Sequence, residues 1–409
     1  MHRSLLTFAV LILLVYSSFA QTIEKTGGHA RLLGMGSNPY IVDPYYITYN
    51  PAWGEYYDNF IFGDLGFSSG NFTRGGINQF IAADFRLSNN ITIGGILARN
   101  DAYGFSISYL DPGDIVTQIN NLVGPNSVVP LNNNFELLGT YHFYFGTVGL
   151  AVAYATTTNE ANPATGGSTT GSASQFGVNA GIIMDLTGRL RLDAAGMLVF
   201  PSASYQPQTG QKSEISQTII GLAAHAFFKY SSKVTFVPSA FFVNSSGTLN
   251  NAGTSGDLTS MSGFGFGIGI NYTVGDFLLA GGPAFSTFST TIPSTATTAE
   301  LKNSVFSFPV WNFGVEWNML DWLVARFGYI SLTNKATTQT PVAGSPGQVN
   351  EFVMTNFTGQ NGATLGLGFK FGSFTLDATI NEDVLRQGLN NIGGGGPTFA
   401  FMSLSYAMP

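Results

Sequence analysis

The 409-residue chain contains no cysteine and few charged residues. The absence of cysteine excludes disulfides, cysteine-ligated zinc, a thiol nucleophile and a lipid anchor on a processed cysteine. Asp, Glu, Lys and Arg together make up 10% of the residues, against about 25% in ordinary soluble domains. Hydrophobic residues make up 44%, which is close to the usual share. The composition is therefore unusual in missing charge rather than in excess apolar residues.

No apolar run is long enough for a membrane-spanning helix, although the N-terminus carries a shorter one. His2 and Arg3 precede an apolar run over 5–16, and Ser18-Phe19-Ala20 forms a small-x-small cleavage motif. This pattern indicates a secretory signal peptide over residues 1–20, because a spanning helix needs about 20 apolar residues. A secreted, charge-poor chain without membrane helices is predicted to reside in the outer membrane of a diderm bacterium, after cleavage near Ala20.

The chain also lacks the charge and histidine patterns of several functional classes. Its net charge is −7, without blocks of like charge, so it has no basic surface for nucleic acid and no charged tail. After the signal peptide the histidines are His29, His142 and His225, on separate elements without metal-ligand spacing. We therefore predict that the chain is not an enzyme and binds no metal or cofactor.

Aromatic residues, glycine and alternating apolar positions are abundant. Aromatic residues make up 14% of the chain, and glycines number 51. Over 311–329, large apolar side chains occupy one face of two strands joined by a turn at 320–322, and small or polar residues occupy the other. This register places Glu316 opposite Arg326 on the polar face. Strands that turn an apolar face to lipid and a polar face to a lumen are typical of transmembrane β-barrels.

Similar alternating runs recur along the chain, and counting them gives roughly sixteen strands. We interpret 91–110 as one kinked strand interrupted at Asn100-Asp101, because dividing it would invert every later connection. The predicted fold is all-β: a closed antiparallel transmembrane barrel over residues 59–409, with short periplasmic turns and long extracellular loops. The predicted long loops lie at about 111–134, 159–173, 201–213, 244–260, 289–302, 333–357 and 381–397.

Charged residues fall on the inward faces of the predicted strands, as expected if a charge at the lipid midplane costs about 2–4 kcal/mol. Asp185 is expected opposite Arg191, and Lys370 diagonal to Asp377. These pairs could gate or select a permeant, or they could only neutralise each other. The predicted lumen charges are Glu136, His142, Asp185, Arg191, Glu316, Arg326, Lys370 and Asp377.

The segment before the first strand shows no alternation and is rich in Gly, Pro, Asn and Tyr. We predict that residues 21–58 fold into the lumen as a plug, because a free tail would leave its apolar residues in water. The glycines that alternate over 263–269 lie in a strand pattern with no helix after it, so they do not form a phosphate loop. They are expected to leave lumen space for the plug. The apolar residues of the segment are Leu32, Leu33, Met35, Ile41, Val42 and Ile47.

This segment also carries motifs that resemble those of a known family. Residues 28–36 (GHARLLGMG), Asp43 and then 50–52 (NPA) resemble the N-terminal hatch of FadL-like outer-membrane barrels. The likeness is greatest to the branch that contains the PorV and PorQ proteins of Bacteroidota. The 311–329 hairpin and the closing region 364–406 look like that branch as well. His29, Asn38-Pro39 and Trp53 depart from its pattern.

The resemblance implies a barrel of about fourteen strands, and we prefer this number to the count of alternating runs. It also implies a hatch, which could be a mobile gate or a fixed plug turn. Such barrels usually end on an aromatic residue that the barrel-insertion machinery reads, whereas this chain ends in the sequence YAMP. The implied hatch or gate residues are Arg31, Gly34, Gly36, Asp43, Asn50, Pro51 and Ala52.

Three hypotheses for function follow from the resemblance. The first is passage of small hydrophobic compounds across the outer membrane, with release through a side opening near a strand kink, which Asn100-Asp101 could supply. The second is a PorV-like role in type IX protein secretion, in which the barrel binds secreted cargo. The third is a structural or adhesive surface barrel. The expected partners are outer-membrane lipid, the barrel-insertion machinery, and hydrophobic small molecules or protein cargo; nucleic acid is not expected.

Overall fold

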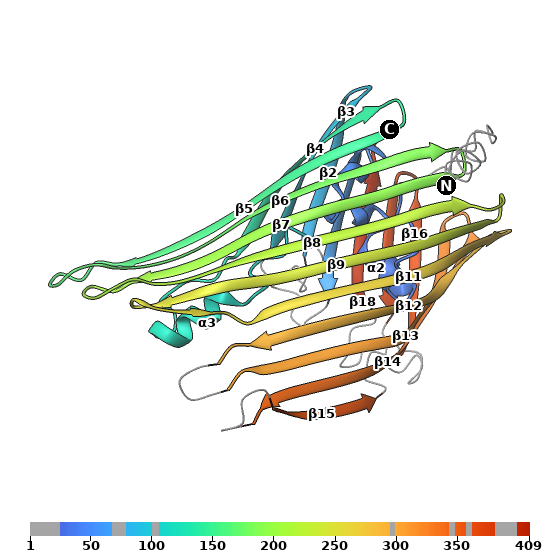
Figure 1. Ribbon diagram of the computed structural model, residues 1–409. Coiled ribbons are helices and arrows are strands. Elements are labelled where there is room, and N and C mark those ends of the chain that lie inside the picture. The colour runs from blue at the N-terminus through green and yellow to red at the C-terminus, as the bar shows by residue number, and fades with distance from the viewer. Residues whose placement is uncertain are drawn as a thin grey trace, which may run out of the picture.

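The computed structural model describes residues 25–67, 79–99, 106–294, 299–342, 348–356, 362–380 and 399–409. These residues form a tilted β-barrel that encloses a short segment near the N-terminus (Figure 1). The predicted signal peptide at 1–20 and the predicted kink at Asn100-Asp101 lie outside the described residues. No helix in these described ranges has the length and apolar character needed to cross a membrane.

The wall is one antiparallel sheet of 18 strands that closes on itself, since β1 pairs with both β2 and β18. β9 pairs directly with β11, and β14 with β16. The short strands β10 (Thr254–Asp257) and β15 (Val349–Asn356) therefore stand outside the ring, and sixteen strands form it. The count from alternation is confirmed, and the number of about fourteen implied by the resemblance is wrong.

The ring strands are β1 (Phe60–Phe67), β2 (Phe80–Ser88), β3 (Ile91–Arg99), β4 (Asn133–Phe143), β5 (Gly146–Ala161), β6 (Thr169–Thr187), β7 (Leu190–Gln206), β8 (Ser213–Lys229), β9 (Val234–Asn251), β11 (Ser260–Val274), β12 (Phe277–Ile292), β13 (Leu301–Leu320), β14 (Leu323–Pro341), β16 (Gly362–Phe371), β17 (Phe374–Ile380) and β18 (Phe399–Ala407).

The two faces of the wall have opposite character, as the alternation predicts. On the hairpin of β13 and β14, Phe313 and Phe327 are exposed on the outer face, while Val324 and Arg326 are buried on the inner face. Exposed aromatic and aliphatic side chains recur on strands all round the ring. The ring thus has an extensive apolar outer surface, and charged side chains such as Arg326 and Asp377 lie inside it.

Both predicted charge pairs across hairpins are in register. Glu316 lies opposite Arg326, and Asp185 lies opposite Arg191. A register shift follows each of these pairs on the way to the turn. The last pairs before the turns are Leu320 with Leu323 and Thr187 with Leu190.

The wall is much taller on one side than on the other (Figure 1). β5 to β9 and β11 to β14 have 15 to 20 residues each, whereas β1 to β3 and β16 to β18 have 7 to 10. At about 3.3 Å per residue the longest strands span roughly 50–65 Å, about twice the height of a lipid-facing band. Most of the residues at 201–213 and 244–260, which were predicted as loops, belong to these long strands. The prediction missed them because a strand that is polar on both faces shows no alternation of apolar and polar residues.

Residues 106–131 form a compact unit against the inner face of the tall wall, where a kinked strand and a loop were predicted. β3 ends at Arg99, and the helix α3 (Ile115–Val123) follows. The Asp111 carboxylate accepts hydrogen bonds from the backbone N–H groups of Ile115 and Val116 at 2.7 and 3.1 Å, which stabilises the start of the helix. The buried cluster around α3 comprises Leu110, Ile115, Val116, Ile119, Val128, Leu131, Ala155, Ala173, Ala203, Ile215 and Leu258.

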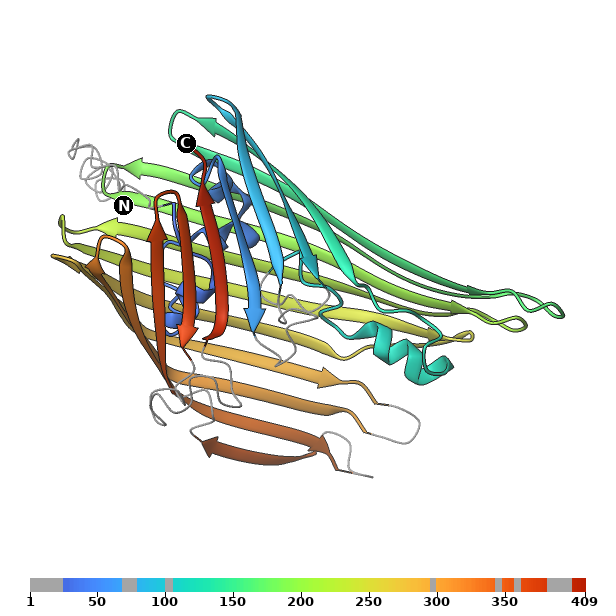
Figure 2. The same cartoon turned by 180° about the vertical axis from the view of Figure 1, so that it is seen from behind.

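Residues 25–59, here called the inner segment, lie inside the ring (Figure 2). They contain the short helix α2 (His29–Gly34) and two 3-10 turns, η1 (Pro44–Thr48) and η2 (Pro51–Glu55). The side chains of Asp43 and Asn50 cap these turns by accepting hydrogen bonds from backbone N–H groups, both at 2.9 Å. A proline follows each cap, and its fixed φ suits the first helical position. Local sequence thus specifies both turns.

Candidate functional site

The inner face of the wall is recessed where the inner segment touches it. A Cβ placed at Gly269 would lie 2.1 Å from the ring of Tyr40, and one at Gly149 would lie 2.3 Å from the backbone nitrogen of Ala52. Both contacts are too short for any residue but glycine without a shift of the backbone or ring. The wall is therefore shaped to the inner segment. Similar close approaches occur on β6 at Gly181 and on β14 at Gly328.

Two of the four glycines of 263–269 lie against the inner segment. Gly267 and Gly269 both face Tyr40. The space over Gly263 is filled by the Phe288 ring, and that over Gly265 by Phe241 and the backbone of β12. The part of β11 that carries Gly263 and Gly265 therefore packs against aromatic side chains of the neighbouring strands.

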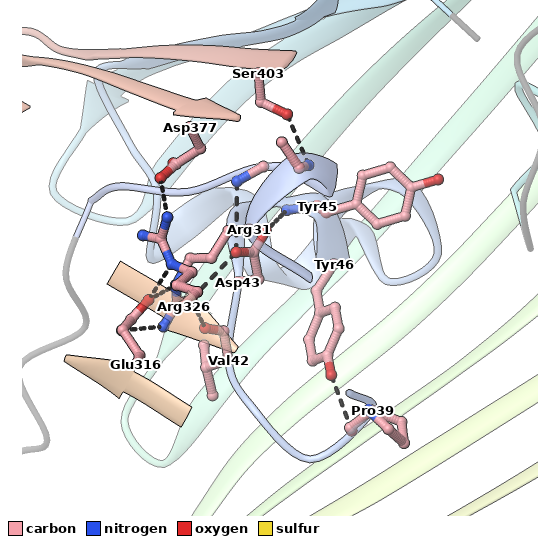
Figure 3. Close-up of polar contacts among 12 residues, drawn as sticks. Arg31, Pro39, Val42, Asp43, Tyr45, Tyr46, Glu316, Arg326, Asp377 and Ser403 are labelled. Atoms are coloured by element: carbon pink, nitrogen blue, oxygen red, sulfur yellow. Dashed lines mark hydrogen bonds and ion pairs between the residues drawn. The ribbon is translucent and has the colours of Figure 1, made fainter. Parts of the chain in front are cut away.

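Five charged side chains meet where α2 touches β13, β14 and β17 (Figure 3). Arg31 donates hydrogen bonds to both carboxylate oxygens of Glu316, at 2.8 and 3.0 Å, and to Asp43 at 3.1 Å. Arg326 donates to Glu316 at 2.6 Å and to Asp377 at 2.5 Å. Charge-assisted bonds of this kind are among the strongest in proteins. We call these five residues the ionic cluster. Its Arg31–Glu316 bonds fasten the inner segment to β13, and Arg326 links β13 to β17.

The ionic cluster includes one predicted pair and one member of another. Glu316 and Arg326 interact as predicted. Lys370 lies opposite Thr375 and is therefore diagonal to Asp377, as predicted, and Asp377 binds Arg326. The hatch motif pointed to Arg31 and Asp43, but their partners on the wall could not be found from spacing, because those partners lie far along the chain.

Two titratable groups of the inner segment, Asp43 of the ionic cluster and the nearby His29, are buried in an environment that disfavours charge. Burial raises the pKa of Asp43 to about 6, against the opposing effect of the adjacent Arg31 guanidinium. Burial lowers the pKa of His29 to about 4. The His29 ring stacks on Tyr45, with centroids 4.6 Å apart, and meets the Phe401 ring edge-on at 4.9 Å. The neutral imidazole therefore packs as an aromatic group.

Asp193 on β7 forms a second attachment point for the inner segment. It accepts hydrogen bonds from the Asn50 side-chain amide and from Trp53 Nε1, the latter at 3.0 Å. His225 Nδ1 on β8 lies 3.3 Å from the same carboxylate. The His225 ring stacks on Tyr46 with centroids 5.5 Å apart. Neither Asp193 nor His225 was among the site residues predicted from the sequence.

Arg86 on β2 forms a third attachment point, at the end of the inner segment. Its guanidinium lies 3.0 Å from Glu55 and 2.8 Å from Asp58. Lys25 also contacts Asp58, at 2.7 Å, and the Thr92 hydroxyl donates to Glu55 at 2.7 Å. Arg86 itself is partly exposed, so this attachment is more hydrated than the ionic cluster.

The predicted pair of Asp185 and Arg191 is present, and the inner segment joins it. Two hydrogen bonds of 2.7 and 3.1 Å connect the side chains. The Arg191 guanidinium lies over the Tyr56 ring, 4.7 Å from its centroid, a distance suited to a cation–π contact. Asp185 is about half exposed, so the pair sits near water.

The two other predicted lumen residues lie on β4. Glu136 is fully buried and accepts a hydrogen bond from Ser108. His142 is within 3.1 Å of the Thr147 hydroxyl across the hairpin to β5. Neither residue contributes to the ionic cluster. The predicted lumen charges therefore lie at several separate positions on the inner wall.

The small residues of the hatch motif sit where backbones come close. Gly36 has φ +72°, which favours glycine. Its N–H donates to Thr364 at 3.1 Å, and its carbonyl accepts from the Asn312 side chain at 2.9 Å. A Cβ at Gly34 would lie 3.2 Å from the Cα of Gly366. Pro51 and Ala52 form the start of η2 behind the Asn50 cap.

Most of the polar groups described above attach the inner segment to the wall. Within the described ranges, no three His, Asp or Glu side chains are grouped so that they could hold a metal ion. The ionic cluster pairs its cations and anions with one another. These contacts can hold the inner segment across the inside of the barrel.

Comparison with known proteins finds similarity only among solved structures. No protein-family model matches the chain. No curated protein sequence matches it either. A Pseudomonas aeruginosa FadL homologue aligns with a TM-score of 0.39 and 12% identity, over 92% of this chain and 98% of that one. The Pseudomonas putida toluene transporter TodX aligns with a TM-score of 0.38 and 10% identity, over 95% and 100%.

A longer chain is similar at the same level. The FrpB iron transporter from Neisseria meningitidis (F3-3 variant) aligns with a TM-score of 0.40 and 11% identity. The alignment covers 78% of this chain and 61% of FrpB. The chain thus spans less than two thirds of the length of that transporter.

Proposed function

We propose that the chain is an outer-membrane barrel that passes small hydrophobic compounds, with the inner segment as its plug. The observation that carries this proposal is the combination of a closed ring, an apolar outer face and an inner segment fastened across the interior. An apolar outer face of this extent would be unfavourable in water. Lipid is the environment that accepts it.

The plug role rests on the contacts of the inner segment. It is attached by the ionic cluster, by Asp193 and by Arg86, and the wall has glycines where its backbone and rings approach. A segment held in this way blocks free diffusion of water-soluble molecules through the ring. A hydrophobic compound needs either a small displacement of this segment or an exit through the wall.

Uptake into lipid vesicles tests the transport proposal. The purified full chain, reconstituted into vesicles with a lipopolysaccharide outer leaflet that resists hydrophobic solutes, should accelerate entry of small aromatic hydrocarbons and alkanes above the rate of the same vesicles without protein. Entry of a polar solute such as glucose should stay at the protein-free rate. Unchanged uptake of every hydrophobic compound tested, in vesicles shown to contain folded barrel, would remove this function.

The second candidate is binding of secreted protein cargo, as in the PorV-like role. The tall polar part of the wall favours it, because strands such as β6 and β7 continue well beyond a lipid-facing band. There they carry hydroxyl pairs between strands, for example Ser172 with Ser204 at 3.0 Å. Native purification followed by identification of bound lipids and proteins separates the candidates. Recovery of neither a secretion subunit nor cargo would leave transport or an adhesive surface role.

A further inference from the structure

Two phenylalanine rings on the inner face of the tall wall lie over glycines of β11. The Phe288 ring of β12 occupies the space over Gly263, and the Phe241 ring of β9 occupies the space over Gly265. A Cβ at either glycine would lie 2.4 Å from a ring carbon. The ring centroids are 5.8 Å apart and the ring planes are inclined by 28°, which is within the range of interacting aromatic pairs. The glycines thus allow two rings from different strands to meet over β11.

The rings belong to an apolar stripe that crosses five neighbouring strands of the wall, β9 and β11 to β14 (Figure 1). Residues directly opposite each other on antiparallel strands point to the same face, and Gly263 and Phe288 are such a pair. Beyond Phe288 the row continues through two further inward positions, and on the other side of Gly263 through one. The members of the row, from β9 to β14, are Val243, Gly263, Phe288, Val305 and Ala336.

Polar but uncharged residues flank this stripe on the same inner face. Two residues from Val305 in one direction, Asn303 accepts a hydrogen bond from the Thr338 hydroxyl at 2.9 Å. Two residues away in the other direction, the Ser307 hydroxyl donates to Asn334 at 2.6 Å. None of these inward positions on the described strands carries a charged side chain. The stripe is therefore an apolar surface bounded by hydrogen-bonded pairs, and it offers no counterion to a charged ligand.

The stripe is open to the inside of the barrel beside the inner segment. Tyr40 covers Gly267 and Gly269, the next inward glycines of β11. Phe241 and Phe288, which lie beyond Tyr40 along the strand, are each partly exposed, and so is Val305. Because these side chains point inward in a closed ring, their exposed surface faces the interior and not the lipid. An apolar compound that covers this surface is stabilised by the removal of apolar area from water.

The two rings favour one class of apolar compound. Aromatic rings interact best with other aromatic rings that lie against them in an offset or edge-on arrangement. An alkane of the same size covers the same area but lacks this additional attraction. A fatty acid would bring a carboxylate to rows that hold no cation, and burial of an unpaired charge is very costly. The surface therefore fits an uncharged ring compound better than it fits either an alkane or a fatty acid.

We propose that Phe241 and Phe288, with Val243 and Val305 beside them, form a binding site for an uncharged planar aromatic compound of one or two rings. Apolar and aromatic side chains with a few polar groups at the edge are the usual lining of a small-molecule site. This inference rests on the proposed function, whose substrate class it narrows from hydrophobic compounds in general to aromatic ones. Without a ligand role, the rings would only shield the glycines of β11.

Equilibrium binding of naphthalene to the full chain in lipid nanodiscs tests the site. Empty nanodiscs of the same lipid measure partition into lipid alone, and the difference between the two should saturate. Decahydronaphthalene, which has the same carbon skeleton without aromatic rings, should compete several-fold less well than unlabelled naphthalene. Naphthalene-2-carboxylate should also compete poorly, because the rows around the stripe hold no cation.

Variants of the two rings show whether binding occurs at this place. Phe241→Ala and Phe288→Ala should each weaken naphthalene binding by about fivefold or more, since each removes an aromatic contact and apolar area. Phe288→Leu keeps the surface apolar and should reduce the preference for naphthalene over decahydronaphthalene. Phe264→Ala is the matched control, because Phe264 lies between the two glycines on β11 but on the outer face, where it is 50% exposed. It should bind naphthalene as the wild type does.

Three results would overturn the proposal. If the wild-type barrel shows no saturable binding beyond that of empty nanodiscs, the rings only shield β11. Binding and preference that are unchanged in a Phe241→Leu/Phe288→Leu double variant would place the ligand elsewhere, and equal competition by decahydronaphthalene would remove the aromatic class. If the alanine variants do not fold, the leucine variants decide. Naphthalene binding without uptake into vesicles would remove the transport function and leave this site, whereas uptake without binding would do the opposite.

Discussion

Arg31 of the inner segment and Glu316 of β13 form a two-bond ion pair across 285 positions of sequence. The same Glu316 carboxylate accepts a hydrogen bond from Arg326, which in turn binds Asp377 on β17. A helix of six residues has little stability of its own. Its place inside the barrel therefore depends on this buried pairing and on the packing around it.

Replacing Arg31 by alanine should weaken the barrel strongly. The change leaves Asp43 without its guanidinium partner and Glu316 with one partner in place of two. Breaking a buried ion pair from one side typically costs about 3–5 kcal/mol, and the remaining Arg326 keeps the loss near the lower end. Denaturant unfolding of the reconstituted barrel measures it, and protease access to the inner segment should rise in parallel.

Arg191→Ala serves as the control for that variant. Its partner Asp185 is about half exposed, and such pairs contribute about 0–1 kcal/mol. Arg31→Lys should fall between the two, because lysine keeps the charge but cannot donate two parallel hydrogen bonds to Glu316. Equal losses for Arg31→Ala and Arg191→Ala would contradict the role given to the ionic cluster.

Gly269→Ala should displace Tyr40 from the wall. The added Cβ would lie 2.1 Å from the ring, and overpacking of this kind costs about 1–3 kcal/mol. The loss should be smaller when Tyr40 is already alanine, so a double-mutant cycle should show coupling between the two positions. Gly139→Ala on β4 has nothing within 4 Å of its new Cβ and should leave unfolding unchanged. An additive cycle would show that the ring moves freely.

Asp193→Asn should loosen the turn at η2. The carboxylate accepts from Asn50 and Trp53 and lies beside His225, and hydrogen bonds to a charged group are worth about 1.5–3 kcal/mol. An amide of the same size accepts with only one oxygen and carries no charge. Unfolding free energy should fall, and indole hydrogen exchange at Trp53 should accelerate. Unchanged exchange at this indole would mean that packing alone holds it.

The alternation of apolar and polar residues was sufficient to predict the number of wall strands and the faces of their side chains. It was not sufficient to predict the contacts between the wall and the inner segment. It gave sixteen strands and the inward position of Arg326, because a period of two decides which face each side chain takes. It could not pair Arg31 with Glu316, since that contact exists only once the ring has closed. It also missed α3, whose cap is the more distant Asp111 rather than the residue before the helix. Strand ends were misplaced where both faces are polar.

Lowering the pH should weaken the attachment of α2 through His29. Burial lowers the folded-state pKa of His29 to about 4, against about 6.5 in an unfolded chain. Between these two pKa values the unfolded state therefore binds more protons than the folded state. The stabilising effect of neutral His29 is complete above the unfolded-state pKa and is lost as the pH falls towards the folded-state pKa. A tenfold difference in proton affinity between the two states corresponds to about 1.4 kcal/mol. Because the ring is partly exposed, we expect a loss of about 2 kcal/mol.

His29→Phe isolates this effect, because phenylalanine keeps the ring that stacks on Tyr45 and cannot bind a proton. Asp43 acts in the opposite direction: its pKa of about 6 in the folded state lies above the unfolded value of about 3.9, so it adds stability as the pH falls through that window. Asp43 is present in both proteins, so the difference between wild type and His29→Phe cancels its contribution. Unfolding free energies measured from neutral to acidic pH should therefore diverge, with the variant becoming relatively more stable below about 6.5. Parallel curves would show that His29 is protonated in the folded barrel as easily as in the unfolded chain.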